Sequence, residues 1–136
     1  MANILNILRV VDNEPKYYEF IRLLRNDERV KQGFIQQLDI TKEQQEVYMQ
    51  KHAHEYWVCL CDENPCGYVG VIDGDIRVAT SPDYQKLGVG VFMINFLQEK
   101  FHKDEIYAKV KIDNEASKKL FEKAGYKAKY YIYTLE

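Results

Sequence analysis

Apolar and polar residues alternate along the chain with two different periods, which divide it into short strands and amphipathic helices. Runs rich in β-branched and aromatic residues predict strands over residues 4–11, 56–61, 67–72, 75–80, 106–112 and 127–135. Apolar positions at helical spacing predict helices after Pro15, over residues 41–52, from residue 89 to about residue 101, and over residues 116–124.

Local signals mark several ends of these elements. Thr41 and Gln44 form a capping-box pattern at the start of a helix. Asp73-Gly74 is a strong two-residue hairpin signal between two strands. Gly125 follows the last helical pattern, where a glycine is typical of a C-terminal cap.

The predicted order of elements is β-α-α-β-β-β-α-β-α-β. Strands over 56–80 follow one another through short turns and form an antiparallel meander, whereas the later strands alternate with helices. This order predicts an α+β fold with a central mixed sheet flanked by helices. The length of 136 residues, 46% of them hydrophobic, suits a single domain over 1–136 with one core.

Charge and hydropathy exclude some partners. The formal net charge is −2, so no basic field indicates nucleic acid or an anionic membrane as a partner. No apolar run approaches the roughly 20 residues that span a bilayer, and the N-terminal residues lack a signal-peptide pattern. We therefore expect a cytoplasmic protein, in which Cys59, Cys61 and Cys66 are reduced thiols.

The segment Gln85-Lys86-Leu87-Gly88-Val89-Gly90 stands between a predicted strand and a predicted helix. The first amides of a helix have no internal partner, and the helix dipole adds partial positive charge there. Small glycines leave these amides accessible, which suits a phosphate or pyrophosphate group. The segment therefore predicts a site for a phosphate-bearing cofactor or substrate.

Two segments resemble the GCN5-related N-acetyltransferase family. Gln85-x-x-Gly88-x-Gly90 matches that family's acetyl-CoA loop, (Q/R)-x-x-G-x-(G/A). A second block, from Asn114 through Ser117, Leu120 and Phe121 to Tyr126, resembles the family's N-x-x-(A/S)-x-x-L-Y-E-K-x-G-F. The likeness covers roughly residue 59 to the C-terminus and implies the family's fold, acetyl-CoA as co-substrate and no metal.

The resemblance also implies which residues bind the cofactor. Backbone amides over Leu87, Gly88, Val89 and Gly90 would hold the pyrophosphate of coenzyme A, flanked by Gln85 and Lys86. Val78, Ala79 and Thr80 would offer backbone groups to the pantetheine arm and the acetyl carbonyl, where a parallel strand pair splays. Asn114 and Ser117 would lie near the same arm, and Phe121 would pack against the acetyl group or the sulfur. An ordinary helix cap at Asn114 and ordinary turn glycines remain the alternative.

Acetyl transfer needs a neutral amine, a stabilised thioester oxygen and a protonated or otherwise stable leaving thiolate. The family commonly uses a tyrosine as the acid where this chain has Phe121, which has no proton to donate. Tyr126 is our candidate acid, with Tyr130, Tyr131 and Tyr133 nearby in sequence. The thiolate could also leave unaided, since a thiol pKa lies near ~8.5.

Asp75 is our candidate base, and Asp73, Glu55, His52 and His54 are the other candidates. An alternative is a zinc-dependent domain, in which His52 and His54, followed by Cys59 and Cys61, would be four potential zinc ligands. Structural zinc sites usually space their ligands C-x₂₋₄-C and H-x₃₋₅-H, so we expect no metal site.

The N-terminal half gives a hint about the acceptor. The segment 23–30 (LLRNDERV), followed by Thr41-x-Glu43, resembles a pattern of nucleotide-amino-sugar acetyltransferases and of ribosomal-protein N-terminal acetyltransferases. We expect a small-molecule primary amine, with an amino sugar on a nucleotide carrier as the leading candidate and Arg25 as a candidate contact of the acceptor or of its phosphate. The alternatives are a peptide or protein N-terminal acetyltransferase and a non-catalytic acyl-CoA-binding module. A final edge strand over 127–135 could pair across a two-fold axis in a homodimer.

Overall fold

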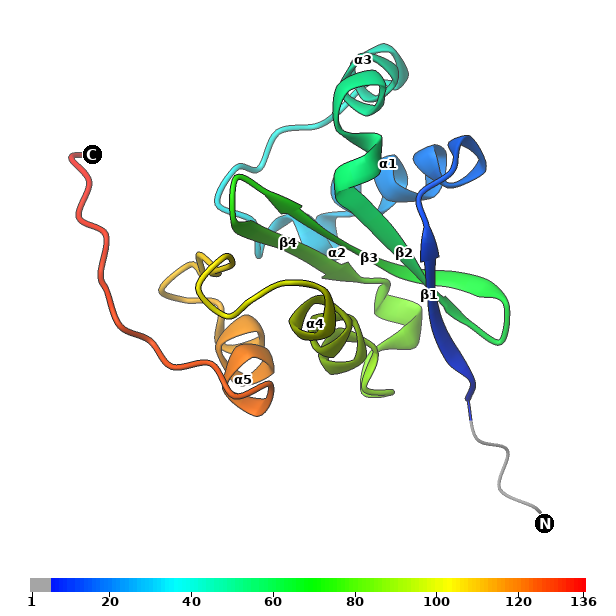
Figure 1. Cartoon of the computed structure of the whole chain (residues 1–136). Coiled ribbons are helices and arrows are strands. Elements are labelled where there is room, and N and C mark those ends of the chain that lie inside the picture. Colours follow the sequence, from blue (N-terminus) through cyan, green and yellow to red (C-terminus); the bar gives the residue numbers. More distant parts are fainter. Residues whose placement is uncertain (1–5) are drawn as a thin grey trace.

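The computed structural model describes residues 6–136, and its helices and strands are labelled in Figure 1. Their bounds are β1 (Leu8–Asp12), α1 (Tyr18–Asn26), α2 (Glu28–Lys31), α3 (Lys42–His52), β2 (Tyr56–Cys61), β3 (Asn64–Ile72), β4 (Asp75–Thr80), α4 (Val89–Lys100) and α5 (Glu115–Lys123). Residues 4 and 5 of the predicted first strand lie outside the described residues.

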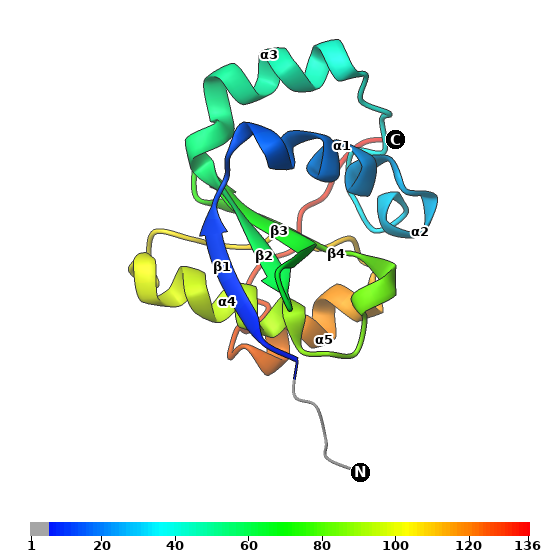
Figure 2. The same ribbon diagram turned by 90° about the vertical axis from the view of Figure 1, so that its right-hand side faces the viewer.

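The four strands form one antiparallel sheet in the order β1-β2-β3-β4. Figure 2 shows α1, α2 and α3 on one face of the sheet and α4 and α5 on the other. Alternate side chains of β2 point to opposite faces of the sheet: Cys59 and Cys61 pack on the α4 side, and Val58 and Leu60 pack on the α1 side. A strand covered on both faces has no polar side, which explains the unbroken apolar run of β2.

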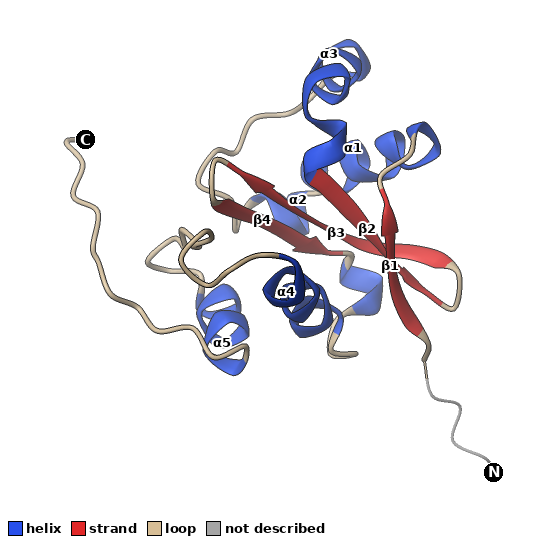
Figure 3. Ribbon diagram, viewed as in Figure 1, coloured by secondary structure: helices blue, strands red, loops and turns tan. Residues whose placement is uncertain are grey.

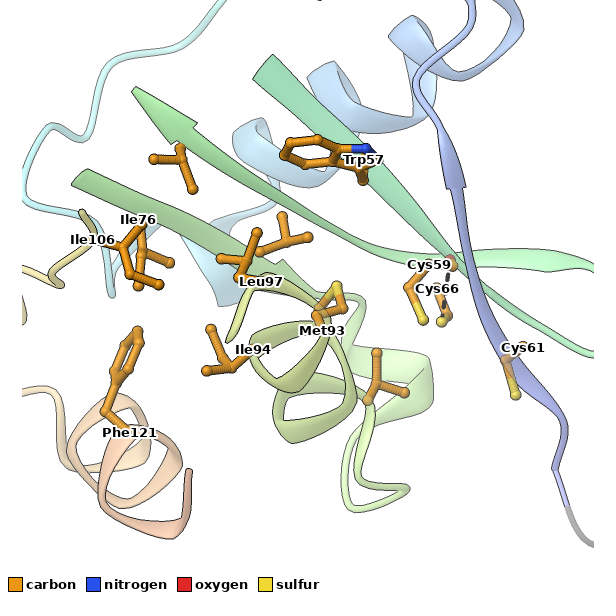
Figure 4. Close-up of a cluster of buried hydrophobic side chains, with 13 residues drawn as sticks. Trp57, Cys59, Cys61, Cys66, Ile76, Met93, Ile94, Leu97, Ile106 and Phe121 are labelled. Atoms are coloured by element: carbon orange, nitrogen blue, oxygen red, sulfur yellow. Dashed lines mark hydrogen bonds between the residues drawn. The ribbon is translucent and has the colours of Figure 1, made fainter. Parts of the chain in front are cut away.

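In the core on the α4 side, one face of that helix packs against apolar side chains of β2, β3 and β4 (Figure 4). Val89, Met93, Ile94 and Leu97 recur at helical spacing and are all at most 2% exposed. Burial of each such side chain contributes roughly 1.5–3 kcal/mol relative to exposure. The packing fixes α4 against the sheet, and therefore fixes the loop before α4 against the end of β4.

The predicted hairpin at Asp73-Gly74 is confirmed, with positive φ angles of 51° and 83°. The capping box is also confirmed, because Thr41 Oγ1 accepts from Gln44 N and Gln44 Oε1 accepts from Thr41 N. At the C-terminal end of α5, Gly125 has a φ of 94°. Tyr126 N donates there to Phe121 O, as in a Schellman motif.

The predicted strand over 106–112 is wrong as a strand. This segment joins the sheet only through a parallel bridge between Asp75 and Tyr107 (tan in Figure 3). Farther along, the segment makes no further bridge to β4, and Lys111 Nζ donates to Gln32 O in the chain after α2. The mixed sheet of the prediction is therefore an antiparallel sheet with one parallel contact, still of the α+β class.

The predicted strand over 127–135 is wrong as well. These residues form no strand, and their trace runs clear of the sheet after α5 (Figures 1 and 3). Tyr130 and Tyr133 are 89% and 91% exposed. A strand needs a neighbouring strand for its hydrogen bonds, and the preceding segment 106–112 does not offer a ladder.

No helix of the described residues has the length and apolar character needed to cross a bilayer.

Candidate functional site

One groove of about 1260 Å³ crosses the molecule on the open side of β4. Its walls come from α1, the chain over residues 29–37, β4, the loop before α4, the segment 109–114 and α5. Ligand pockets usually measure about 300–1,000 Å³, so the groove has room for more than one small molecule. All the residues predicted to bind the cofactor line it except Leu87.

The loop before α4 is a cradle of free backbone amides. Within the described chain, no N–H group from Gln85 to Val91 donates a hydrogen bond, and the first that does is Phe92 N, to Gly88 O at 3.0 Å. Free N–H groups at a helix start, reinforced by the helix dipole, bind anions. We call this arrangement of free backbone groups the amide cradle (residues 85–91), and it stands at the position of the predicted phosphate site.

The two glycines of the cradle serve different purposes. Gly88 has a φ of 77°, which strains any residue with a side chain, and a Cβ there would meet nothing within 4 Å. Gly90 lies inside α4, where a Cβ would come within 2.9 Å of Leu120 Cδ1. Gly88 therefore shapes the loop, whereas Gly90 allows α4 to approach α5 closely.

The outer edge of β4 is open beyond its bridge to Tyr107. There, Ile76 N donates to Tyr107 O at 2.8 Å. Farther along, Gln85 Nε2 donates to Thr80 O at 3.2 Å and so ties the cradle to the end of the strand. An open strand edge next to the cradle can exchange hydrogen bonds with an amide-bearing ligand. Val78, Ala79 and Thr80 line the groove along this edge.

Asn114 acts as a helix cap and as a bridge across the groove. Its Oδ1 accepts from Ser117 N at 3.0 Å, and its Nδ2 donates to Gly33 O at 3.1 Å. The predicted cap is therefore real, and the side-chain amide is already engaged at both ends. Asn114 and Ser117 line the groove, but in this structure Asn114 holds the chain around Gly33 in place.

Phe121 is only 7% exposed and faces the groove. The ring of Tyr126 packs edge-on against it, with 5.3 Å between ring centroids, and Tyr126 is not part of the groove wall. Asp75 does line the groove, with its side chain 14% exposed, and Arg77 Nε donates to its Oδ2 at 3.1 Å. Of the two candidate catalytic residues, Asp75 is thus at the groove and Tyr126 lies behind Phe121.

The side chains of Tyr56, Tyr68 and Arg77 also line the groove, and the prediction from the sequence missed all three. Burial raises the pKa of Tyr68 to about 12, although the Arg25 and Arg77 charges oppose the rise. Burial likewise raises the pKa of Tyr56, whose hydroxyl lies 2.7 Å from that of Tyr48. Strand alternation could have indicated them, because the three residues share one face of the meander.

The alternative zinc constellation does not come together. Cys59 and Cys61 are buried in the α4-side core, and His52 Nδ1 lies 2.6 Å from Glu55 Oε1. Over residues 6–136, no cluster of three His, Cys, Asp or Glu side chains could hold a metal ion.

Coenzyme A fits the groove by the chemistry of its walls. The amide cradle suits a diphosphate, the open edge of β4 suits the amides of a pantetheine arm, and Lys86, Lys119 and Lys123 add positive charge at the same end.

The sequence matches the family model described as Acetyltransferase (GNAT) family over residues 15–126. No curated protein sequence matches it significantly.

Solved structures share the fold. Spermidine N-acetyltransferase from Vibrio cholerae, in complex with CoA and spermine, has a TM-score of 0.73 and 22% identity over 87% of this chain and 79% of that chain. A putative acetyltransferase from Salmonella typhimurium, with its cofactor acetyl-CoA, has a TM-score of 0.72 and 13% identity over 87% and 78%.

AAC(6')-Iy, in complex with a bisubstrate analogue, CoA-S-monomethyl-acetylneamine, has a TM-score of 0.70 and 12% identity over 96% and 97% of the two chains. These identities establish a shared fold, and the family match covers most of this chain. The chain therefore belongs to the GNAT family, and it is an N-acetyltransferase that uses acetyl-CoA to acetylate an amine.

Proposed function

We propose that the chain moves the acetyl group directly to a primary amine of a small molecule bound in the same groove, with an amino sugar on a nucleotide carrier as the leading acceptor. The observation that carries this proposal is the composition of the groove wall. Among residues 6–136, no cysteine or histidine lines the groove, and the three cysteines are buried in the core. A wall without an activated nucleophile favours direct attack by the amine within a ternary complex over a covalent acetyl-enzyme.

Bound acetyl-CoA supplies an activated acetyl thioester. The amide cradle would hold its diphosphate, and open backbone groups of Val78, Ala79 and Thr80 would orient the arm. Asp75 would take the proton from the amine, directly or through a water molecule, while Arg77 holds its carboxylate. Phe121 shields the groove floor, and Tyr126 supports the position of Phe121.

No proton donor stands at position 121, and the placement of Tyr126 gives little support for it as the acid. The thiolate of coenzyme A therefore leaves without a dedicated acid, since its conjugate thiol has a pKa near ~8.5. Above that pH the released coenzyme A is stable as a thiolate and needs no proton. We expect the reaction rate to be unchanged in Tyr126→Phe, once folding is confirmed by circular dichroism.

The test is a thiol-release assay with a panel of amines: amino sugars with and without a nucleotide carrier, polyamines, aminoglycosides and peptides with free N-termini. We expect amine-dependent release of free coenzyme A with a small amine, and a loss of at least tenfold in kcat for Asp75→Asn. If the purified protein binds acetyl-CoA but releases no thiol with any amine, the catalytic proposal fails. Preferential turnover of peptides would move the acceptor to the N-terminal acetyltransferase class.

We further propose that the protein is a cytoplasmic homodimer that has no nucleic-acid or membrane partner. Two segments support the dimer. Residues 127–135 expose Tyr130, Tyr131 and Ile132, and over Ala108–Val110 no backbone group forms a hydrogen bond within the described chain. If these segments paired between two copies of the chain, the exposed side chains would be covered and the free backbone groups would gain hydrogen-bond partners. Light scattering at micromolar concentration should give twice the chain mass, and a monomer would refute the pairing.

A further inference from the structure

Part of the groove wall lies on the α1 side of the sheet, and we call the part lined by Arg25, Tyr56, Tyr68 and Arg77 the recess. Tyr56, Gly70 and Arg77 lie side by side across β2, β3 and β4. A Cβ at Gly70 would come within 2.5 Å of Tyr56 Cδ1, so the ring of Tyr56 occupies the space that a side chain there would take. In the adjacent row, Tyr68 stands opposite Ala79.

Two guanidinium groups from separate elements face this recess. Arg77 comes from β4 and Arg25 from α1, and both line the groove. Arg25 lies over the ring of Tyr48, whose hydroxyl is 2.7 Å from that of Tyr56, and Tyr56 shares a row with Arg77, so both guanidinium groups border the same part of the groove. Arg25 forms no ion pair or hydrogen bond in the part of the chain that the structure describes, and its guanidinium lies 6.0 Å from the ring centroid of Tyr48.

Tyr68 adds a hydrogen-bond donor to this part of the groove. The residue is only 3% exposed and lines the groove, and its hydroxyl has no hydrogen-bond partner among residues 6–136. The hydroxyl oxygen itself is not fully buried, so it is available to a ligand in the groove. Its pKa of about 12 keeps it protonated at neutral pH, so it is a hydrogen-bond donor to whatever fills the recess.

The charges of the groove favour an anion over a polycation. Among the described residues, and apart from the three lysines at the coenzyme end, five lysine and arginine side chains line the groove, against two carboxylates, Asp75 and Asp113. Both carboxylates already lie near cations, Asp75 at 3.1 Å from Arg77 Nε and Asp113 at 3.6 Å from Lys111 Nζ. A polyamine would therefore meet no free carboxylate among the described wall residues.

We infer that the acceptor is an amine that carries a phosphate or diphosphate group, which Arg25 and Arg77 hold from two sides while Tyr68 donates a third hydrogen bond. Guanidinium forks match phosphate oxygens in pairs, and an anion with oxygens on several sides suits donors on two walls. This inference rests on the proposed transfer to a small amine and names the substrate class of that site.

The test begins with the protein saturated with coenzyme A, so that the amide cradle is filled. Uridine diphosphate is then titrated by calorimetry, with inorganic pyrophosphate as a second probe. We expect saturable binding by the wild type and a loss of about 10–100-fold in affinity for Arg25→Gln and for Arg77→Gln, the range of one to two charge-assisted hydrogen bonds. Tyr68→Phe should lose about three- to tenfold. Arg9→Ala, which removes a guanidinium paired with Glu63 outside the groove, should bind like the wild type.

The outcomes separate this inference from the proposed function. Absence of diphosphate binding to the CoA-saturated protein overturns the inference, as does undiminished binding in both arginine variants. Faster acetylation of spermidine than of a nucleotide-linked amino sugar overturns it too, while thiol release in the same assay would leave the proposed function standing. Circular dichroism and coenzyme A affinity confirm that each variant is folded with an intact cradle.

Discussion

Asn114 Nδ2 donates to Gly33 O at 3.1 Å, although the two residues are 81 positions apart. A Cβ at Gly33 would lie 2.8 Å from the same nitrogen, so the contact depends on a glycine. The bond links the start of α5, on the cofactor side of the groove, to the segment after α2 on the acceptor side. One side chain therefore sets both the start of a helix and the separation of two walls.

The two roles of Asn114 can be separated by substitution. Asn114→Ala removes the cap and the bridge, and we expect it to lower the free energy of unfolding by about 1 kcal/mol. Asn114→Asp keeps an oxygen for Ser117 N and loses only the donor to Gly33 O. Hydrogen exchange should then show near-normal protection of α5 in Asn114→Asp but faster exchange over residues 32–38 in both variants. Equal exchange of that segment in Asn114→Asp and the wild type would contradict the bridge.

The glycines of the amide cradle should respond differently to alanine. Gly88→Ala forces a side chain into a left-handed conformation, which costs about 1–2 kcal/mol, and distorts the free amides. We expect weaker coenzyme A binding by tenfold or more, measured by calorimetry. Gly90→Ala instead presses on Leu120 and should mainly lower the melting temperature. If Gly88→Ala binds coenzyme A like the wild type in a folded protein, the cradle is not the diphosphate site.

Alkaline pH should destabilise the fold through Tyr68. Burial raises its pKa to about 12, above the value near 10 of the unfolded chain, so the folded state holds this proton more tightly. The contribution is complete below pH 10 and is lost as the pH rises towards 12, on the order of 3 kcal/mol. Denaturant unfolding from pH 8 to pH 12 should show this fall, and Tyr68→Phe should reduce it. Identical pH profiles of the two proteins would refute the assignment.

The turn between β2 and β3 places two non-glycine residues at positive φ, 49° for Asp62 and 70° for Glu63. Two-residue hairpins of this kind favour glycine at the second position. Glu63 is paired with Arg9, so the clean comparison is made in the Arg9→Ala background, where that ion pair is already absent. There, Glu63→Gly should raise the melting temperature by roughly 2–4 °C. A lower melting temperature would mean that the turn is not strained at this position.

Features with a local cause were predictable from the sequence. The capping box of α3, the cap at Asn114 and the hairpin at Asp73-Gly74 each depend on neighbours a few residues away. The amide cradle was predictable for the same reason, since a glycine loop before a helix leaves its amides free whatever the rest of the fold does.

The two wrong strands show what alternation alone cannot give. Ile106, Ala108 and Val110 do turn towards the core, as their spacing predicts. Their backbone nevertheless lacks a partner beyond Tyr107, because the chain there is drawn across the groove by Lys111. The direction in which successive side chains point is a local property of the backbone, whereas a strand also requires a second strand within hydrogen-bonding distance.

The acceptor end was the least predictable part of the site. Tyr56, Tyr68 and Arg77 are distant in sequence from the glycine loop and belong to no motif with it. They meet because β2, β3 and β4 pair in a register that places Gly70 between Tyr56 and Arg77. Such a row follows from tertiary pairing, so a sequence pattern could only have shown that the three residues share a face.

In the proposed binding mode, the coenzyme is held by main-chain N–H groups, which every amino acid except proline supplies. The proposed acceptor end depends instead on particular side chains of β2, β3, β4 and α1. Drift in those side chains can therefore redirect which amine is modified while the coenzyme stays bound, so the scaffold is well suited to acquiring new acceptors during evolution or in directed evolution.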